Sequence, residues 1–472
     1  MSVWMLAPET GMTVLAFVFF LESLNFEALR KLRGLTVWMA AGITALAAFC
    51  LAARGVFFSG CYTLDGLSQI FKLAIAFGFT VVAAMGPRPA AVASDTRPDY
   101  FMLLAVSALG LMLLSSATEL TTMYLALELA SLSLYAVAPL RAQSRLAAEA
   151  AVKYILFGAM VTALSLYGLS LIMASQHSTF LSELAAKPWS MAQTPLAVLG
   201  LSLFLCGFLF KLALFPFHFW APDVYQGVGN ETAAFVSTLP KLGVVAVLVR
   251  LVGTLGMNAQ TGAALAILAA LSMTLGNLSA LAQKDIKRLL GYSAVSHAGY
   301  ATIGLVAGGP DGLASATFYS VCYLLMNLAA FFVVCGLNPD GSNPTLSSLD
   351  GLYKRSPATA FVLMIASFSL VGLPPTAGFT GKFFLLGSLW NSGNHWLVVV
   401  AVFNTAIAIY YYLNMVRHAY TLEQTDIENN IDNHASVRPL LGGALSMALL
   451  AIGMYPLPLF SFAQEAIKSI LK

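Results

Sequence analysis

Residues 210–225 read Phe-Lys-Leu-Ala-Leu-Phe-Pro-Phe-His-Phe-Trp-Ala-Pro-Asp-Val-Tyr and close a long apolar run. Lys211 lies inside that run, Pro216 follows it five residues later, and His218 and Asp223 come just beyond. Proline lacks a backbone N–H and clashes with the turn before it, so a helix is expected to break here. A charge beside a broken helix is costly in an apolar environment, and the stretch therefore indicates a path for something polar.

The composition indicates that this stretch lies in a membrane. Hydrophobic residues make up 59% of the 472 positions, charged residues only 10%, and the mean hydropathy is +0.82. A soluble domain carries about 25% charged residues. No soluble fold hides this much apolar surface, so we expect an integral membrane protein. The small net charge of +3 gives no sign of nucleic-acid binding.

The apolar runs predict an all-α polytopic membrane protein with about 14 transmembrane helices. A spanning helix needs about 20 apolar residues, and little of the chain is left over once the runs are assigned. Alternation with a period of two is absent, so a β-barrel is not expected. The better-defined spans are expected near residues 3–23, 35–53, 67–86, 100–117, 119–139, 149–173, 231–251, 289–308, 313–336 and 438–456.

Pairs of polar residues suggest an internal repeat. Glu128 and His297 are about 170 positions apart, and so are Lys211 and Lys382. A second break is expected at the prolines of residues 374–375, just before Lys382. Two five-helix units with an odd number of spans each would be inverted repeats, each with a broken helix, an arrangement common in transporters.

The repeat predicts four parts of the chain. Residues 1–99 would hold the first three helices, 100–255 the first repeat and 256–420 the second. Residues 421–472 would hold a cytoplasmic loop, the last helix and a tail.

The basic residues of the loops predict the orientation. Those after even-numbered spans are only Arg54, Lys187 and Arg250. Those after odd-numbered spans are Arg30, Lys31, Arg33, Arg88, Arg97, Arg141, Arg145, Lys284, Lys287, Arg288, Lys354, Arg355, Arg417 and Arg438. Cytoplasmic loops carry the excess of Lys and Arg, so both termini are expected on the outer side of the membrane.

Four charged residues lie deep in their expected spans. Glu128 is about nine residues from either end of its span, roughly 13 Å at about 1.5 Å per residue. One interpretation is a structural salt bridge to a lysine. The other is a proton-binding site whose pKa is set by two opposing effects, desolvation and a neighbouring lysine. Lys211, Lys241 and Lys382 are candidate proton relays, because a buried lysine can lose its proton near neutral pH. A purely structural role is the alternative for each.

Two further residues belong to the candidate site. His297 shares a helix face with Ser293, Ser296 and Tyr300, so relay and satisfied core histidine both stay open. Lys153 lies only about a turn inside its span, where snorkelling to the surface competes with a relay role. Lys72 lies at a similar depth, and there snorkelling is preferred over a relay role.

The sequence gives no sign of a bound cofactor. None of the five cysteines forms a CxxC pair, so neither an iron–sulfur cluster nor zinc is expected. Residues 378–382 read Gly-Phe-Thr-Gly-Lys but lack the spacing and the following Ser/Thr of a phosphate loop. The first apolar run has no basic region ahead of it, so no cleavable signal peptide is expected.

Three motifs resemble the antiporter-like membrane subunits of respiratory complex I. They are residues 210–227, residues 285–300, and Gly-Phe-Thr-Gly-Lys-Phe at 378–383. Asp-Val-Tyr at 223–225 and a lysine at 382 are most similar to the subunit N branch of bacterial NADH–quinone oxidoreductase, rather than to branches M and L. Residues 228–232 depart from the family, which usually reads Ala-Pro-Thr-Pro there.

The resemblance implies a role for each candidate residue. Glu128 and Lys153 would form an ion-paired entry region, and Lys211 would be the central lysine. Lys241 would connect it onward, His297 would bridge the two repeats, and Lys382 would lie on the exit side. The chain would be a translocase subunit in the bacterial inner membrane, moving protons in response to remote quinone reduction. Flavin, iron–sulfur clusters and quinone would belong to partner subunits, and neighbouring antiporter-like subunits would be its direct partners.

Two other functions stay open at this point. A subunit of a multi-subunit sodium/proton antiporter shares these helices and would exchange sodium without NADH. A structural spacer that joins pumping subunits would tolerate the loss of every deep lysine.

Overall fold

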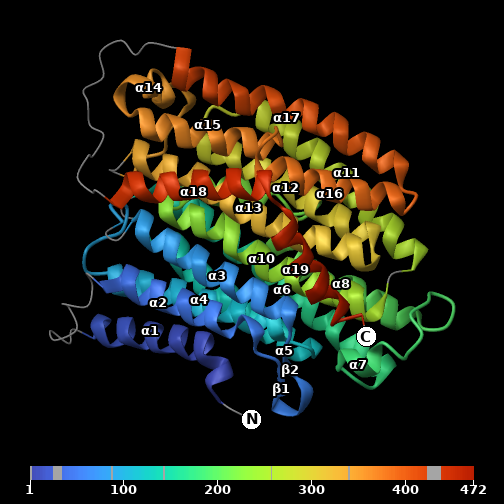
Figure 1. The fold of residues 1–472 in the computed structure, drawn as a ribbon. Helices are drawn as coiled ribbons and strands as arrows, with labels where there is room; N and C mark the ends of the chain where they lie inside the picture. Colours follow the sequence, from blue (N-terminus) through green and yellow to red (C-terminus); the bar gives the residue numbers. More distant parts are fainter. Residues whose placement is uncertain are drawn as a thin grey trace.

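The fold was analysed in a computed structural model that describes residues 3–24, 35–86, 89–141, 144–256, 258–338, 341–421 and 437–471. The predicted basic residues at 30, 31, 33 and 88, and most of the predicted cytoplasmic loop after residue 421, lie outside these ranges. Figure 1 shows a bundle of roughly parallel and antiparallel helices, with α1 and α2 along one edge and α17 along the opposite edge.

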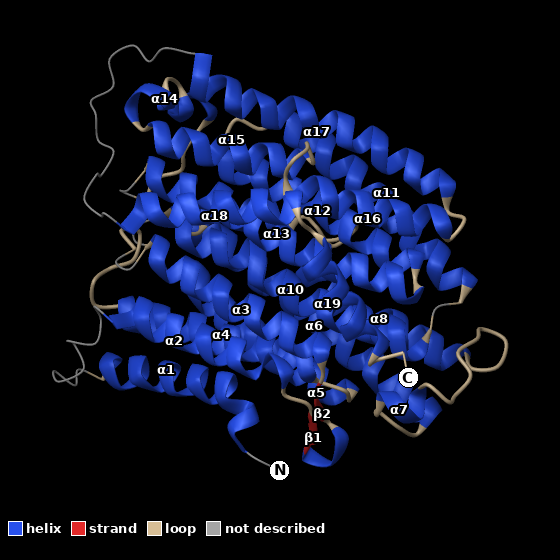
Figure 2. Cartoon of the chain, in the orientation of Figure 1, coloured by secondary structure: helices blue, strands red, loops and turns tan. Residues whose placement is uncertain are grey.

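The first half of the described chain contains ten α-helices and one short hairpin (Figure 2). The helices are α1 (Ala7–Ser23), α2 (Thr36–Phe49), α3 (Gly66–Met85), α4 (Arg97–Ser116), α5 (Leu120–Val137), α6 (Arg145–Gln176), α7 (Leu181–Leu184), α8 (Pro195–Leu212), α9 (Trp220–Gly227) and α10 (Asn230–Leu255). Strands β1 (Gly55–Phe57) and β2 (Tyr62–Leu64) pair antiparallel between α2 and α3.

The second half of the described chain contains nine α-helices. They are α11 (Ala259–Leu281), α12 (Ile286–Ala307), α13 (Gly309–Leu337), α14 (Leu352–Arg355), α15 (Pro357–Val371), α16 (Ala377–Asn391), α17 (His395–Thr421), α18 (Val437–Met454) and α19 (Leu457–Lys468).

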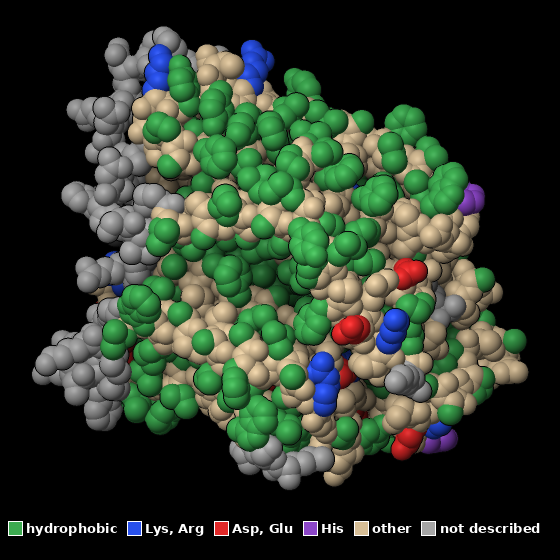
Figure 3. All heavy atoms as spheres, in the orientation of Figure 1, with side chains coloured by type: hydrophobic (Ala, Val, Ile, Leu, Met, Phe, Trp, Pro, Cys, Tyr) green, Lys and Arg blue, Asp and Glu red, His purple; other side chains and the backbone are tan. Residues whose placement is uncertain are grey.

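The predicted multi-pass, all-α membrane architecture is confirmed at the level of its apolar helices. Among the described residues, ten helices are long and apolar enough to cross a membrane, or up to eleven if α18 and α19, bent by 75°, form one span. Apolar side chains also dominate the face seen in Figure 3. Trp38 and Phe49 on the outside are 74% and 76% exposed, which suits contact with lipid rather than water.

The helices differ in how completely the protein surrounds them. In their most apolar windows, 94% of the residues of α10 and 89% of those of α13 are buried, against 33% for α6 and α17. Helices α10 and α13 therefore form the centre of the bundle, and α6 and α17 lie at its periphery.

Helix starts follow from short polar residues in the sequence. Asp65, Glu119, Ser144, Asn258 and Asp285 each accept a hydrogen bond from a backbone N–H in the first turn of the helix that follows. Such a cap satisfies a backbone donor that the helix itself leaves free. These residues fix where α3, α5, α6, α11 and α12 begin.

Both predicted helix breaks are present. Helix α8 ends at Leu212, where Ala213 adopts a left-handed conformation (φ 61°), and α9 resumes at Trp220. Helix α15 ends at Val371, and α16 resumes at Ala377 beyond the two prolines. Irregular backbone at membrane depth is tolerated where protein surrounds it. The helix ends at Leu212 and Val371 are buried, whereas the prolines of both breaks are exposed.

Candidate functional site

Lys211 lies in the last turn of α8, directly before the first break. Its side chain is 2% exposed, and Nζ donates to the hydroxyl of Tyr154 at 2.8 Å. The rings of Tyr135 and Tyr154 face the ammonium group at 4.8 and 4.7 Å from their centroids. A buried cation is therefore held by a neutral hydroxyl and two π-faces.

The backbone groups released at this break find partners from other helices. Trp220 donates from Nε1 to the carbonyl oxygen of Phe210 at 2.8 Å, and the N–H of Phe215 donates to Oγ of Ser272 at 2.9 Å. A buried backbone group without a partner costs about as much as a lost hydrogen bond, so these contacts make the break stable. They also fix the end of α8, and with it the position of Lys211.

Lys241 and His297 meet in the centre of the bundle. Lys241 Nζ donates to the carbonyl oxygen of Ala294 at 2.7 Å. The two ring nitrogens of His297 pair with the hydroxyls of Tyr319 (2.6 Å) and Tyr412 (3.2 Å). Among the described residues, these hydrogen bonds join Lys241 and His297 to neutral groups.

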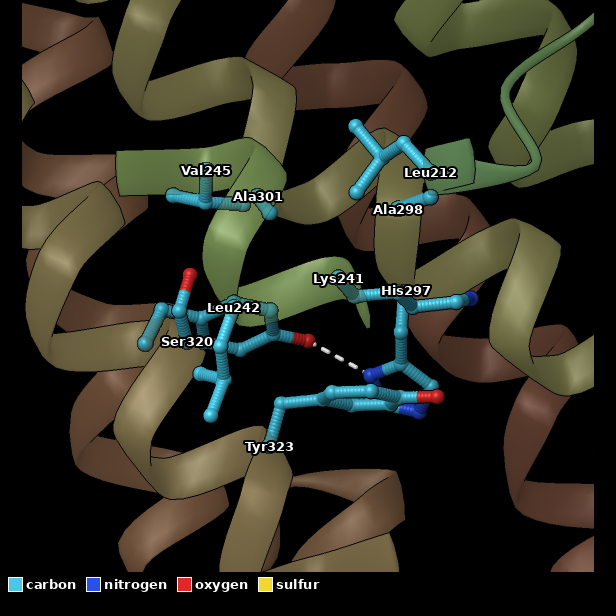
Figure 4. A pocket seen from close by; sticks show the side chains of 10 residues that line it. Leu212, Lys241, Leu242, Val245, His297, Ala298, Ala301, Ser320 and Tyr323 are labelled. Atoms are coloured by element: carbon cyan, nitrogen blue, oxygen red, sulfur yellow. Dashed lines mark hydrogen bonds between the residues drawn. The ribbon is translucent and has the colours of Figure 1, made fainter. Parts of the chain in front are cut away.

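A small cavity lies against both side chains, and Figure 4 shows Lys241 and His297 reaching it from α10 and α12. The dashed line at His297 marks its bond with Tyr319. The cavity is also lined by Leu212, Leu242, Val245, Ala298, Ala301, Ser320 and Tyr323. Leu212 follows Lys211 in the chain, so the cavity reaches the end of α8.

Lys382 contacts the second break from its far side. Its side chain is 5% exposed, and Nζ donates to the carbonyl oxygens of Val371 (2.8 Å) and Leu370 (3.3 Å), the last two residues of α15. The ring of Tyr300 lies 4.3 Å away. The partial negative charge at a helix C-terminus stabilises a cation. Lys382 meets such an end, and Lys211 occupies one in α8.

The predicted residues are close enough to act on one another electrostatically. His297 experiences the charges of both Lys241 and Lys382, and Lys211 experiences that of Glu128. Five of the six predicted residues thus form a central group of two interacting sets, Glu128 with Lys211 and His297 with Lys241 and Lys382, and Lys153 lies outside it.

The implied ion pair between Glu128 and Lys153 is wrong. Glu128 accepts a hydrogen bond from Oγ1 of Thr162 at 2.8 Å. Lys153 instead pairs with Asp223 and Glu149, both at 2.7 Å. Thr162 lies nine residues further along α6 than Lys153, about 13.5 Å at about 1.5 Å per residue. The lysine is therefore at a different depth from the carboxylate.

Asp223 also connects α9 to the second half of the chain. Its other carboxylate oxygen lies 2.5 Å from Nη1 of Arg288, near the start of α12. The side chains of Lys153, Asp223 and Arg288 are 36%, 24% and 29% exposed. This is a partly solvated ion-pair network near the edge of the bundle.

Comparison with known proteins places the chain in a family. Residues 117–408 match the family described as NADH:quinone oxidoreductase/Mrp antiporter, transmembrane. A protein named NADH-quinone oxidoreductase subunit N 2, from Solidesulfovibrio magneticus, is 57% identical across 99% of both chains. The chain belongs to the NADH:quinone oxidoreductase/Mrp antiporter family. The resemblance inferred from its motifs is confirmed.

Two solved structures have the same fold as this chain. A chain of respiratory complex I from Thermus thermophilus, with bound aureothin, is 32% identical with a TM-score of 0.84, covering 96% of this antiporter-family chain and 98% of that chain. A chain of the Mrp complex from Dietzia sp. DQ12-45-1b gives a TM-score of 0.85 at 18% identity, covering 100% and 98%. The second likeness concerns the fold alone.

The matched segment of this antiporter-family chain contains all six predicted site residues. Sequence reasoning missed the tyrosines that hold Lys211 and His297, because tyrosine is common in apolar helices. It also missed Lys287, which is fully buried and donates to the carbonyl oxygen of Val228 at 2.7 Å. Lys287 follows an expected loop directly, and nothing in the local sequence marks it as buried.

Proposed function

We propose that this chain is a proton-translocating membrane-arm subunit of an NADH–quinone oxidoreductase that carries no redox cofactor of its own. The names of its relatives support this proposal, since the relative named NADH-quinone oxidoreductase subunit N 2 aligns with 99% of the chain. Flavin, iron–sulfur clusters and quinone would then belong to partner subunits. Its neighbours would be other membrane subunits of the same complex.

One observation carries the proton-transfer role. Lys211, Lys241 and Lys382 are at least 95% buried, and they donate hydrogen bonds to a hydroxyl or to backbone carbonyls. When a buried lysine has no carboxylate as a hydrogen-bond partner, its ammonium and amine forms come close in free energy. A purely structural cation is normally paired with an anion.

The arrangement suggests how protons move. Glu128 stabilises the ammonium form of Lys211, and the cavity beside Leu212 gives room next to Lys241 and His297. Uptake of a proton at one group makes the neighbouring ammonium groups less stable, because like charges repel strongly at low dielectric. A change of charge at one end of the series would therefore shift a proton at the next group.

The same proposal includes the transmembrane topology. The described helices supply 14 spans if α2, α12 and α18 cross the membrane and if α8–α9 and α15–α16 are broken spans. Two five-helix repeats, α4–α10 and α11–α17, would each have the broken helix in fourth place. The loops with basic residues would face the cytoplasm, and both termini the periplasm.

The decisive experiment is Lys211→Met in the complete complex. The purified complex is reconstituted into liposomes that contain a pH-sensitive dye, and NADH-driven quinone reduction and proton movement are measured together. We expect proton movement to fall while the complex still assembles. Lys284→Met, which removes an exposed loop lysine, is the matched control and is expected to leave both activities intact. Equal proton movement by both variants would refute the role of Lys211.

The family description also includes Mrp antiporters, so sodium/proton exchange is the second candidate function. It predicts that sodium ions drive proton movement in liposomes without NADH. Purification from native membranes separates the two candidates. Copurified flavin and iron–sulfur subunits with NADH-dependent quinone reduction support the first, and antiporter-like partners alone support the second.

A further inference from the structure

A second group of buried charges lies outside the predicted site. Lys72 in α3 is fully buried, and its Nζ lies 2.5 Å from Oε1 of Glu9 in α1. The hydroxyl of Tyr62, in β2, donates to the same oxygen at 2.5 Å. Asp65 and Arg250 form a second pair beside them, with contacts of 2.6 and 3.1 Å.

These five residues form one cluster. Asp65, Gln69 and Lys72 are spaced i, i+4 and i+7 and so share one face of α3. Lys72 experiences the charges of Glu9, Asp65 and Arg250. The two carboxylates and the two cations balance, so the cluster is formally neutral when both acids are ionised.

Several buried polar atoms of the cluster have no hydrogen-bond partner among the described residues. The acceptors are Glu9 Oε2 and the adjoining Gln69 Oε1, and the donors are Arg250 Nε and, apart from its ion pair, Lys72 Nζ. A buried polar atom without a partner is costly. Acceptors and donors mixed in one place match water, which offers both kinds of bond and needs two to four polar partners. A cation would leave the two donors unpaired.

One end of the cluster lies closer to the protein surface than the other. Side-chain exposure rises from Lys72 (0%) through Arg250 (4%) and Glu9 (7%) to Asp65 (12%). Asp65 lies between the β1–β2 hairpin and α3, and Figure 1 shows this hairpin close to the end of the bundle where α1 begins. Helix α3 runs away from the hairpin toward the end where α4 begins at Arg97. The cluster therefore meets the surface at the end opposite Arg97.

We propose that Glu9, Tyr62 and Lys72 form a second proton-binding site, in which ordered water joins the unpartnered atoms and the carboxylate of Glu9 takes up one proton on Oε2. The step converts a hydronium ion and the Glu9 carboxylate into water and a carboxylic acid, and the cluster gains one positive charge. This inference goes beyond the proposed function, because the site lies outside both the central group and the family segment that begins at residue 117.

The titratable groups that act on Glu9 are Tyr62 from β2, Lys72 from α3 and Cys50 from the short 3₁₀ turn after α2. Asp65, the N-cap of α3, and Arg250 from α10 act in turn on Lys72. Burial and the neighbouring Glu9 raise the pKa of Tyr62 well above its ordinary value, so this phenol stays a neutral donor.

The test is an infrared titration of the purified complete complex. The carbonyl stretch of a protonated carboxylic acid is followed from neutral to acidic pH in H₂O and in D₂O. We expect one such band to be lost in Glu9→Gln and kept in Glu22→Gln, a buried carboxyl of the same helix. In the wild type this band should shift in D₂O, because the site exchanges protons with solvent.

A second variant tests the cluster when Glu9 is left in place. Lys72→Met removes the ammonium group, and the midpoint of the band is expected to move to higher pH by roughly 1–3 units. If that variant does not assemble, Tyr62→Phe removes only one hydroxyl and is expected to move the midpoint in the same direction. The proposal is overturned if Glu9→Gln keeps every carbonyl band or if the wild-type band does not shift in D₂O. It is also overturned if the midpoint does not move in Lys72→Met or Tyr62→Phe. Failure of Lys211→Met to alter pumping would leave these outcomes unaffected.

Discussion

Gly378→Ala is expected to damage the second half of the site through the backbone. A Cβ at residue 378 would lie 1.7 Å from the carbonyl oxygen of Ser369, where ordinary contact begins at 3.4 Å. The start of α16 must then move about 1.7 Å (3.4 − 1.7) away from α15. Lys382 lies one turn further along α16, and its 2.8 Å bond to Val371 would lengthen to as much as about 4.5 Å (2.8 + 1.7).

The size of the effect follows from that lost contact. A hydrogen bond to a charged group contributes about 1.5–3 kcal/mol, which corresponds to roughly a tenfold to hundredfold change in an equilibrium. Gly387→Ala on the same helix is the matched control, because a Cβ there meets nothing within 4 Å. That substitution is expected to be neutral or to stabilise α16 by up to about 1 kcal/mol.

The assay compares both variants as assembled complexes. NADH-driven proton movement in liposomes, quinone reductase activity and thermal unfolding are measured side by side. Gly378→Ala should pump much more slowly and unfold at a lower temperature than Gly387→Ala. If the two variants pump and unfold alike, the close approach of α15 and α16 does not position Lys382, and the reasoning is wrong.

Three further changes have defined outcomes. Tyr154→Phe removes the hydroxyl that holds Lys211 at 2.8 Å but keeps the ring, so pumping should fall by about the same tenfold to hundredfold while assembly measured by size-exclusion chromatography is unchanged. Asp65 is buried, but Arg250 and the helix cap hold its pKa below the ordinary value, so it stabilises the fold above about pH 4 and loses this effect as the pH falls through its folded pKa. Asp65→Asn should therefore cost about 3–5 kcal/mol at pH 7 and flatten the acid dependence of thermal unfolding. Asp223→Asn removes a partly solvated carboxylate with two cationic partners, and it should lower stability by about 1 kcal/mol and less at high salt, measured by unfolding at two ionic strengths.

The breaks were predictable because their cause is local. Proline cannot donate a hydrogen bond and excludes the turn before it, so Pro216 and the prolines at 374–375 reveal the ends of α8 and α15 without any tertiary information. The depth of Lys211, Lys241 and Lys382 followed in the same way from their distance to the ends of apolar runs. All three are buried in the structure.

Pairing could not be predicted, since it depends on which helices lie side by side. Position within a span suggested that Lys72 snorkels to the surface, yet it is fully buried against Glu9 from another helix. The same limit explains Lys153, whose partners come from its own helix and from α9 rather than from α5. Sequence position gives depth along one helix, but not the neighbour at that depth.

The oxygens around Lys241 and Lys382 have a consequence for the energy of an empty proton site. A lysine paired with a carboxylate leaves an isolated anion in the membrane when its proton departs, and that anion resists the departure. Lys241 and Lys382 donate to peptide carbonyls, so the deprotonated amine leaves only dipoles behind. Each of these positions can therefore stand vacant without a counter-charge, and a passing proton has no fixed negative ion from which it must escape.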